Sequence, residues 1–205
     1  PRPESQKEDV ETAAASPNQD KEKVFLDLRA GAESGWDYSS RWFKKTSDIT
    51  TIHTTDIVPV DLNALLFILE ETIAEAYRLI RQPLLERKFR NLAEKRAESM
   101  RRFMWNDQTG FYHDYDYLAG QMTDDLTLAG VFPLYAGIAT HEQADRVAHV
   151  IRDKFLLQGG LVTTLEETGQ QWDYPNGWAP LQWVAIQGLR RYGYEELADE
   201  IKRRW

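Results

Sequence analysis

The sequence predicts an all-α protein in which αα-hairpins form part of an (α/α)6 toroid. Three segments are apolar on almost every side, at residues 61–81, 123–139 and 178–192, and each is followed by a more charged or amphipathic segment. A helix that is apolar on every side is buried, whereas a helix that is apolar on one side faces water. The alternation therefore predicts hairpins that each consist of one inner and one outer helix.

The spacing of these hairpins indicates that the toroid is incomplete. The pairs recur about every 55–60 residues, so a closed ring of six hairpins would need on the order of 330 residues. The chain has 205 residues and holds three clear pairs. We therefore expect residues 1–205 to form one partial domain, because stacked hairpins bury their core only together.

Local signals define the other helices. Two short helices are expected on either side of a turn at residues 16–18, with a loop at residues 31–55. Asp61 is an N-cap candidate for the first apolar helix, whose leucines recur at helical spacing. Charged helices are expected at residues 83–104 and 195–205.

Prolines and one capping motif refine the second half of the chain. Pro133 is expected to kink the apolar helix that contains it. Thr140 has capping-box spacing to Gln143 and is expected to open an amphipathic helix that continues through Phe155. Pro180 is compatible with the start of the last apolar helix, where proline is tolerated.

Residues 105–117 leave two interpretations open. Aromatic residues alternate around Thr109 and Gly110, a pattern that is typical of a small β-hairpin. An aromatic turn that packs over a helix end would have the same pattern, and this second interpretation is favoured.

The composition excludes several functional classes. The formal net charge of −8 argues against nucleic-acid binding, which needs a basic face. No apolar run is long enough to span a membrane, and cysteine is absent. The four histidines lack metal-ligand spacing, so no metal or other cofactor is expected. Seven Trp, nine Tyr and eight Phe are typical of a large core or of a carbohydrate site, where sugar rings stack on aromatic planes.

Two Trp-rich loops contain the candidate chemistry. The first loop is ESGWDYSSRW (33–42) and the second loop is QWDYPNGWAP (171–180), and both are expected at the same end of the inner helices. Glycoside hydrolysis needs an acid and a second carboxyl group. Asp37, between Trp36 and Tyr38, suits the acid, because partial burial disfavours the ionised form. A helix N-cap is an equally good role for Asp37.

Both loops resemble the signature segments of the trehalases, glycoside hydrolase family 37. The segments PRPES (1–5) and TTDIVPVDLN (54–63) also resemble trehalase segments, and all four occur in the family's order along essentially the whole chain. The resemblance implies an (α/α)6 barrel that hydrolyses α,α-trehalose to two glucoses with inversion and without a metal. The opening and EQADR (142–146) resemble the bacterial cytoplasmic branch, so a cytoplasmic location is expected. The oligomeric state is not determined by the sequence, and a monomer is expected for the full-length protein.

The resemblance also implies roles for single residues. Asp37 corresponds to the general acid, and the substrate-binding candidates are Arg2, Pro3, Glu4, Gly35, Trp172 and Trp178. Trp172 and Trp178 are interpreted as stacking or pocket-wall residues. Arg41, Asp173 and Asn176 are favoured as braces of the loops, and Asp61 as a helix cap rather than a catalyst.

The family's general base lies on a segment that would follow position 205, and an N-terminal portion with further substrate contacts would precede position 1. The chain alone is therefore expected to be inactive. Two alternatives remain open at this point. One is a non-catalytic helical fragment that binds sugar or acts as a scaffold, and the other is a different (α/α)6 glycosidase, such as a glucoamylase-like enzyme.

Overall fold

The structure, a computed structural model, describes residues 6–16 and 19–205. The helices are α1 (Lys7–Ala14), α2 (Lys21–Glu33), α3 (Val60–Leu79), α4 (Pro83–Phe103), α5 (Phe132–Ala136), α6 (His141–Val150), α7 (Ala179–Arg191) and α8 (Glu195–Arg204). The strands, each of two residues, are β1 (Ile57–Val58), β2 (Trp105–Asn106), β3 (Phe111–Tyr112), β4 (Tyr115–Asp116), β5 (Gln121–Met122), β6 (Leu156–Leu157) and β7 (Gly160–Leu161).

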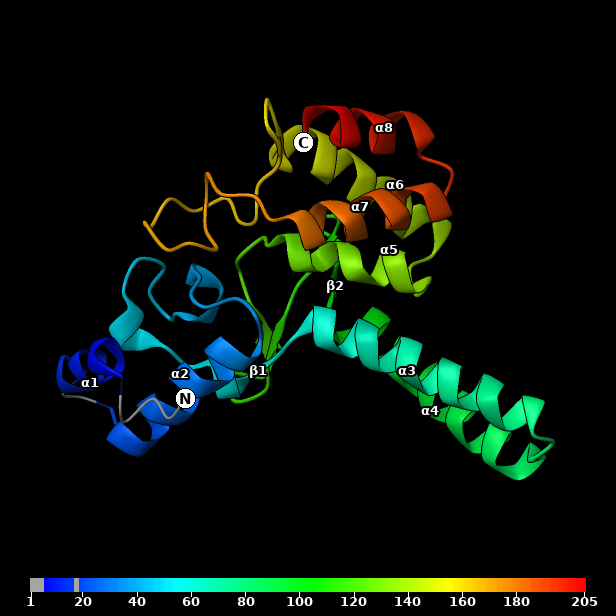
Figure 1. Cartoon of the computed structure of the whole chain (residues 1–205), viewed down its shortest axis with the longest axis horizontal. Helices are drawn as coiled ribbons and strands as arrows, with labels where there is room; N and C mark the ends of the chain where they lie inside the picture. Colours follow the sequence, from blue (N-terminus) through cyan, green and yellow to red (C-terminus); the bar gives the residue numbers. More distant parts are fainter. Residues whose placement is uncertain (1–5, 17–18) are drawn as a thin grey trace.

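The helices are arranged in alternating inner and outer positions, as the sequence predicts. The inner helices follow one another, since α3 packs on α5 and α5 packs on α7. The outer helix α4 packs on α3, α8 packs on α7, and α6 packs on β3. Figure 1 shows the α3–α4 hairpin projecting away from the body that α5 to α8 form. This arrangement is an arc of an α/α toroid.

The inner helices differ in how much of their surface the described residues cover. Helix α7 buries about half of its residues, and α5 buries all but one. Helix α3 instead leaves Leu62, Leu65 and Leu69 50%, 45% and 51% exposed. The expectation of burial on every side is therefore met for α5 only. Helix α7 is largely buried but leaves Trp183 58% exposed, and α3, at one end of the arc, is the least covered of the three.

Residues 123–139 do not form the single long helix that the sequence predicts. The segment begins as an irregular stretch, continues as a 3-10 turn at Leu128–Val131 and becomes α-helical only in α5. The backbone N–H of Leu128 donates to the carbonyl of Thr163 at 2.8 Å, so a distant segment takes the hydrogen bond that a helix would use. Pro133 lies in the first turn of α5 rather than at a kink, and Gly137 ends the helix at φ 81°.

The local signals of the second half are mostly confirmed. Both halves of the Thr140–Gln143 capping box are present at the start of α6, and a π-helical turn continues to Phe155. Pro180 lies in the first turn of α7. Strands β2 and β3 pair as an antiparallel hairpin, so the favoured interpretation of residues 105–117 as a plain aromatic turn is wrong.

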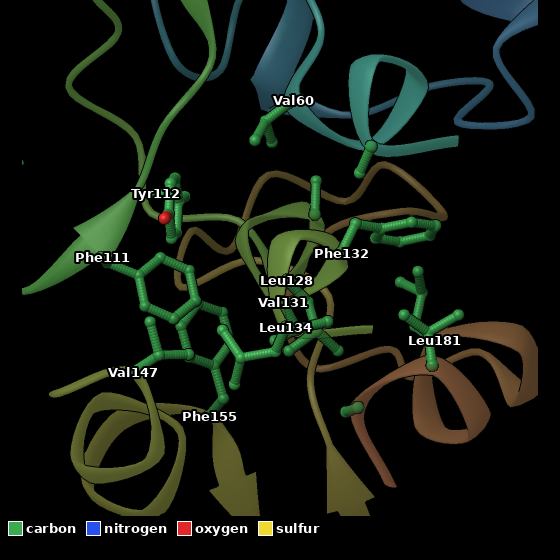
Figure 2. Packing of buried hydrophobic residues seen from close by; sticks show 14 of the residues in the cluster. Val60, Phe111, Tyr112, Leu128, Val131, Phe132, Leu134, Val147, Phe155 and Leu181 are labelled. Carbon is green, nitrogen blue, oxygen red and sulfur yellow. The ribbon is translucent and has the colours of Figure 1, made fainter. Parts of the chain in front are cut away.

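The core joins this hairpin to α5, α6 and α7. Phe111 of β3 stacks on Phe155 with ring centroids 5.6 Å apart. Figure 2 shows Leu134 and Val147 close to this aromatic pair and Leu181 of α7 on the other side of α5. The second sheet, of order β1-β4-β5, pairs Ile57 with Asp116 and so ties the entry of α3 to the segment after β3.

Gly130 provides a test of this packing. A Cβ at Gly130 would lie 2.3 Å from the Phe111 ring and 2.5 Å from the carbonyl oxygen of Tyr112. We expect Gly130→Ala to lower the free energy of unfolding by about 2–3 kcal/mol, because overpacking forces the backbone to move. Gly159→Ala is the control, since a Cβ there meets nothing within 4 Å. Urea unfolding measures both, and equal losses would contradict the prediction.

Candidate active site

The two Trp-rich loops lie against one another, as expected. The backbone N–H of Trp172 donates to the carbonyl of Tyr38 at 3.1 Å. The side-chain amide of Gln171 donates to the carbonyl of Asp37. The second loop is therefore bonded directly to the two residues at the centre of the first loop.

Three tryptophans from both loops form a continuous stack. The ring centroids of Trp36 and Trp172 are 5.2 Å apart, and those of Trp172 and Trp178 are 4.6 Å apart. Trp36 is buried, whereas Trp172 and Trp178 are half-buried. The indole N–H of Trp178 donates to the carbonyl of Gln171 at 3.0 Å. The stack therefore runs from the core outward and ends at Trp178.

Asp173 is a brace between the loops, as predicted. Its carboxylate is completely buried. The groups that donate to it are the hydroxyl of Ser39 at 2.7 Å, the N–H of Ser40 at 2.8 Å, the hydroxyl of Ser40 at 3.0 Å, the hydroxyl of Thr164 at 3.1 Å and the hydroxyl of Thr168. The backbone carbonyl of Asn176 accepts from Thr163 at 3.0 Å, which also agrees with a bracing role.

Arg41 is the second brace, and its partners correct the role of Asp61. The guanidinium donates two hydrogen bonds to Asp61, both at 2.8 Å, and two to Asp114, at 2.7 and 2.9 Å. Pro59 occupies the N-cap position of α3, so Asp61 is not the cap. Burial alone would raise the pKa of Asp61, but the charge and hydrogen bonds of Arg41 hold that pKa below its usual value.

Asp37 lies beside the stack and its side chain is exposed. The partial burial expected between Trp36 and Tyr38 is therefore not provided by the described residues. The N-cap alternative is also wrong, because Ser39 caps the following 3-10 turn by accepting from the N–H of Arg41. Gly35, two residues before Asp37, has a left-handed backbone conformation with φ 81°.

The structure thus brings together Asp37, Gly35, Trp172 and Trp178 from the predicted set. Arg2, Pro3 and Glu4 lie outside the described residues. Within the described part of the chain, no group of three or more His, Asp or Glu side chains is placed to hold a metal ion. None of the helices that the structure describes is long and apolar enough to cross a membrane.

Comparisons with known proteins agree with this geometry. The sequence profile of the trehalase family matches residues 1–205. The chain belongs to the trehalase family. Its structure is similar to neutral trehalase from Saccharomyces cerevisiae, with a TM-score of 0.78 and 30% identity over 90% of the chain. It also resembles a GH63 mannosylglycerate hydrolase from Thermus thermophilus in fold, with a TM-score of 0.69 and 20% identity over 97% of the chain.

This trehalase-family chain spans 35% of the yeast enzyme and 47% of the Thermus enzyme. Both are helical neighbours of the toroid class, so they agree with the arc of inner and outer helices described above. The two loops that resemble the family's signature segments are the loops that pack against one another here.

Sequence reasoning missed an acidic group near the second loop. Burial raises the pKa of Asp125 to about 6, and the charges of Glu166, Asp124 and Asp173 contribute in the same direction. Asp125 lines a polar cavity of about 570 Å³ together with Arg41. The consecutive aspartates Asp124 and Asp125 are visible in the sequence as an acidic pair. Their proximity to Glu166 depends on the tertiary fold.

Asp125 predicts a pH dependence of stability. Between pH 3.8, the ordinary pKa of an aspartate, and about pH 6, the folded chain retains a proton that the unfolded chain releases, so the free energy of unfolding falls as pH rises. We expect Asp125→Asn to be more stable than the parent by roughly 1–3 kcal/mol at pH 7.5, and to differ little at pH 4. Urea unfolding at both pH values, with Asp153→Asn as the exposed control, measures this. A gain that is independent of pH would contradict the assignment.

Proposed function

We propose that residues 1–205 are part of the catalytic domain of an α,α-trehalase that hydrolyses trehalose to two glucoses with inversion. Asp37 is the general acid in this proposal. The observation that carries it is the contact between the two signature loops, in which Trp172 stacks on Trp36 next to Asp37. The resemblance of the opening and of EQADR to the bacterial cytoplasmic branch supports a cytoplasmic location.

The proposed chemistry divides between two carboxyl groups. The acid protonates the oxygen that bridges the two sugars, and a base on the opposite face activates water. In an inverting enzyme these carboxyl groups lie roughly 6.5–9.5 Å apart, which leaves room for the water. The resemblance to trehalases implies a base on a segment that would follow residue 205, and we adopt that assignment.

The tryptophan stack suggests how the substrate is held. Trp172 has a stacked partner in both Trp36 and Trp178, so protein already occupies its ring faces. Trp178 has one stacked partner and is half-buried, which leaves ring surface for the C–H face of a glucose unit. We therefore favour Trp178 over Trp172 as the residue that stacks on sugar, with Trp172 supporting it.

Four other positions complete the proposed substrate site. Gly35 is exposed, and a side chain there would be strained because its φ is positive. Its backbone is therefore open to a sugar hydroxyl. Arg2 can donate up to five hydrogen bonds to hydroxyls, and Glu4 can accept from them. Pro3 lies between them in the PRPES segment and belongs to the same proposed set.

The assignment of the acid predicts the effect of Asp37→Asn in the trehalase polypeptide that contains this chain. Asn keeps the shape of the side chain but cannot deliver a proton. We expect KM to change little and kcat to fall by roughly 10²–10⁴-fold, the range of general acid–base contributions. Glucose release from trehalose measures both constants. Near-normal turnover in a correctly folded Asp37→Asn enzyme would remove Asp37 from the role.

A second candidate function, a fragment that binds sugar without turnover, is favoured by the exposure of the Asp37 carboxyl. We expect residues 1–205 alone to release no glucose from trehalose, because the opposite carboxylate is proposed to lie outside these residues and bulk water weakens electrostatic stabilisation in an open site. The exposed leucines of α3 also favour self-association of the isolated chain.

The assay uses purified residues 1–205, with Asp37→Asn as a control for contaminating trehalase. Turnover by the parent chain that disappears in the control would mean that a base lies within these residues. Glu33, Glu166 and Glu167 would then be tested first.

A further inference from the structure

We infer that Arg41 is a positioning residue for the proposed general acid, and that it acts by fixing Trp36, the residue next to Asp37. This inference rests on the proposed function, because it needs Asp37 to be the acid. Arg41 lies four residues after Asp37 in the same loop, and its side chain is 1% exposed. A side chain this deeply buried is placed to act through its neighbours.

One end of the interaction is a rigid anchor. Asp114 accepts from Nε and Nη2 of Arg41 and also from the backbone N–H of Val60 at 2.8 Å. Asp61 lies in the first turn of α3 and accepts from Nη1 and Nη2 of Arg41. The guanidinium is therefore tied to the start of an inner helix and to the segment between β3 and β4.

The other end of the interaction is aromatic. The guanidinium carbon of Arg41 lies 4.5 Å from the ring centroid of Trp36 and 4.3 Å from that of Trp42. The indole N–H of Trp42 donates to the carbonyl of Trp36 at 3.0 Å. Arg41 thus contacts the ring of Trp36, while Trp42 holds the backbone that leads into Asp37.

This arrangement needs the planar guanidinium of arginine. A guanidinium can face two carboxylates with paired N–H groups in its plane while its flat surface contacts aromatic rings. A lysine ammonium would keep the charge but could not make both paired contacts and remain stacked. The pKa of Arg41 is raised, because the charges of Asp114 and Asp61 outweigh the effect of burial, so the group stays charged.

Displacement of the guanidinium would therefore change the position of the Asp37 carboxyl, because Trp36 lies between them. Without Arg41 as a neighbour, Trp36 would lose a contact that complements its stack on Trp172. Asp37 follows Trp36 directly, so a small rotation of Trp36 moves the carboxyl group. Misplacement by about 1 Å is enough to lower a rate on the order of 10²-fold.

Four variants of the trehalase polypeptide test this inference, with Arg41→Lys as the main one. Asp114→Asn has the same shape as the parent but places an amide against the guanidinium, so it disturbs Arg41 without changing it. The matched control is Arg96→Lys, because Arg96 also binds a carboxylate through two hydrogen bonds, to Glu70 at 2.9 and 2.8 Å, but lies on the α3–α4 hairpin. Asp37→Asn provides the second background.

The expected result is a fall in kcat that depends on Asp37. Arg41→Lys should lower kcat roughly 10²-fold with KM within about threefold of the parent, and Asp114→Asn should have a smaller effect of the same kind. In the Asp37→Asn background, Arg41→Lys should lower kcat almost no further, because both changes act through the carboxyl group of Asp37. Arg96→Lys should leave kcat unchanged, even if it lowers the thermal unfolding midpoint by as much as Arg41→Lys does.

The outcomes separate the inference from the proposed function. Normal turnover by Asp37→Asn would overturn the assignment of the acid and this inference with it. An inactive Asp37→Asn combined with normal kcat in Arg41→Lys and Asp114→Asn would overturn the positioning role alone. A loss in Arg41→Lys that is equally large in the Asp37→Asn background would show that Arg41 only stabilises the fold.

A spectroscopic measurement on the 205-residue chain covers the case in which Arg41→Lys folds poorly. The indole N–H resonances of Trp36 and Trp172 should shift in Asp114→Asn and remain in place in Arg96→Lys. Unchanged Trp36 and Trp172 resonances in a folded Asp114→Asn chain would overturn the proposed path from Arg41 to Asp37.

Discussion

Charge buried beneath the two Trp-rich loops is the constraint on which the candidate site depends. An isolated buried carboxylate is costly, and it is stabilised only if hydrogen-bond donors or an opposite charge surround it. The donors to Asp173 come from Ser39 and Ser40 of the first loop and from Thr164 and Thr168 of the segment before the second loop. Separation of the loops would remove the donors of Ser39 and Ser40 from this buried charge, so Asp173 helps to keep the loops together.

Arg41 extends the same constraint to the helical frame. Its charge is neutralised by Asp61 at the start of α3 and by Asp114 after β3. The loops are thus attached to an inner helix and, through Thr163 and Leu128, to the segment that leads into α5. Because these inner helices pack side by side, the arc of the toroid sets the relative positions of loops that are distant in sequence.

The sequence predicted the features that depend on local chemistry. Helices with regular periodicity, such as α3 and α4, and the Thr140 capping box are determined by residues close to one another. The two loops were found because Trp, Asp, Gly and Pro are concentrated there, and their contact followed from placing both at one end of the inner helices. The features that were predicted wrongly depend on distant partners.

Two examples show this dependence. The apolar residues around Gly130 predict a helix. The Phe111 ring and the Tyr112 carbonyl pack closely against Gly130, and the chain forms a 3-10 turn there. Asp61 has the sequence context of a cap, yet Arg41, twenty residues earlier, binds its carboxylate. The proximity of Asp125 to Glu166 likewise requires the fold, because no local pattern brings the two residues together.

The position and the proton affinity of the proposed acid are controlled by different parts of the protein. Position is set within this chain, since Trp172 and Arg41 contact the ring of Trp36 before Asp37, and the N–H of Trp172 binds the carbonyl of Tyr38 after it. Proton affinity depends on how much water reaches the carboxyl, because burial favours the protonated form. The side chain of Asp37 is exposed among the described residues, so the proposed role of acid would need further residues to cover it. Under the proposed function, the segment that carries the base is suited to provide that cover, since it must approach the same bond from the opposite side. Completing the site would then supply the second carboxylate and bury the first in a single step.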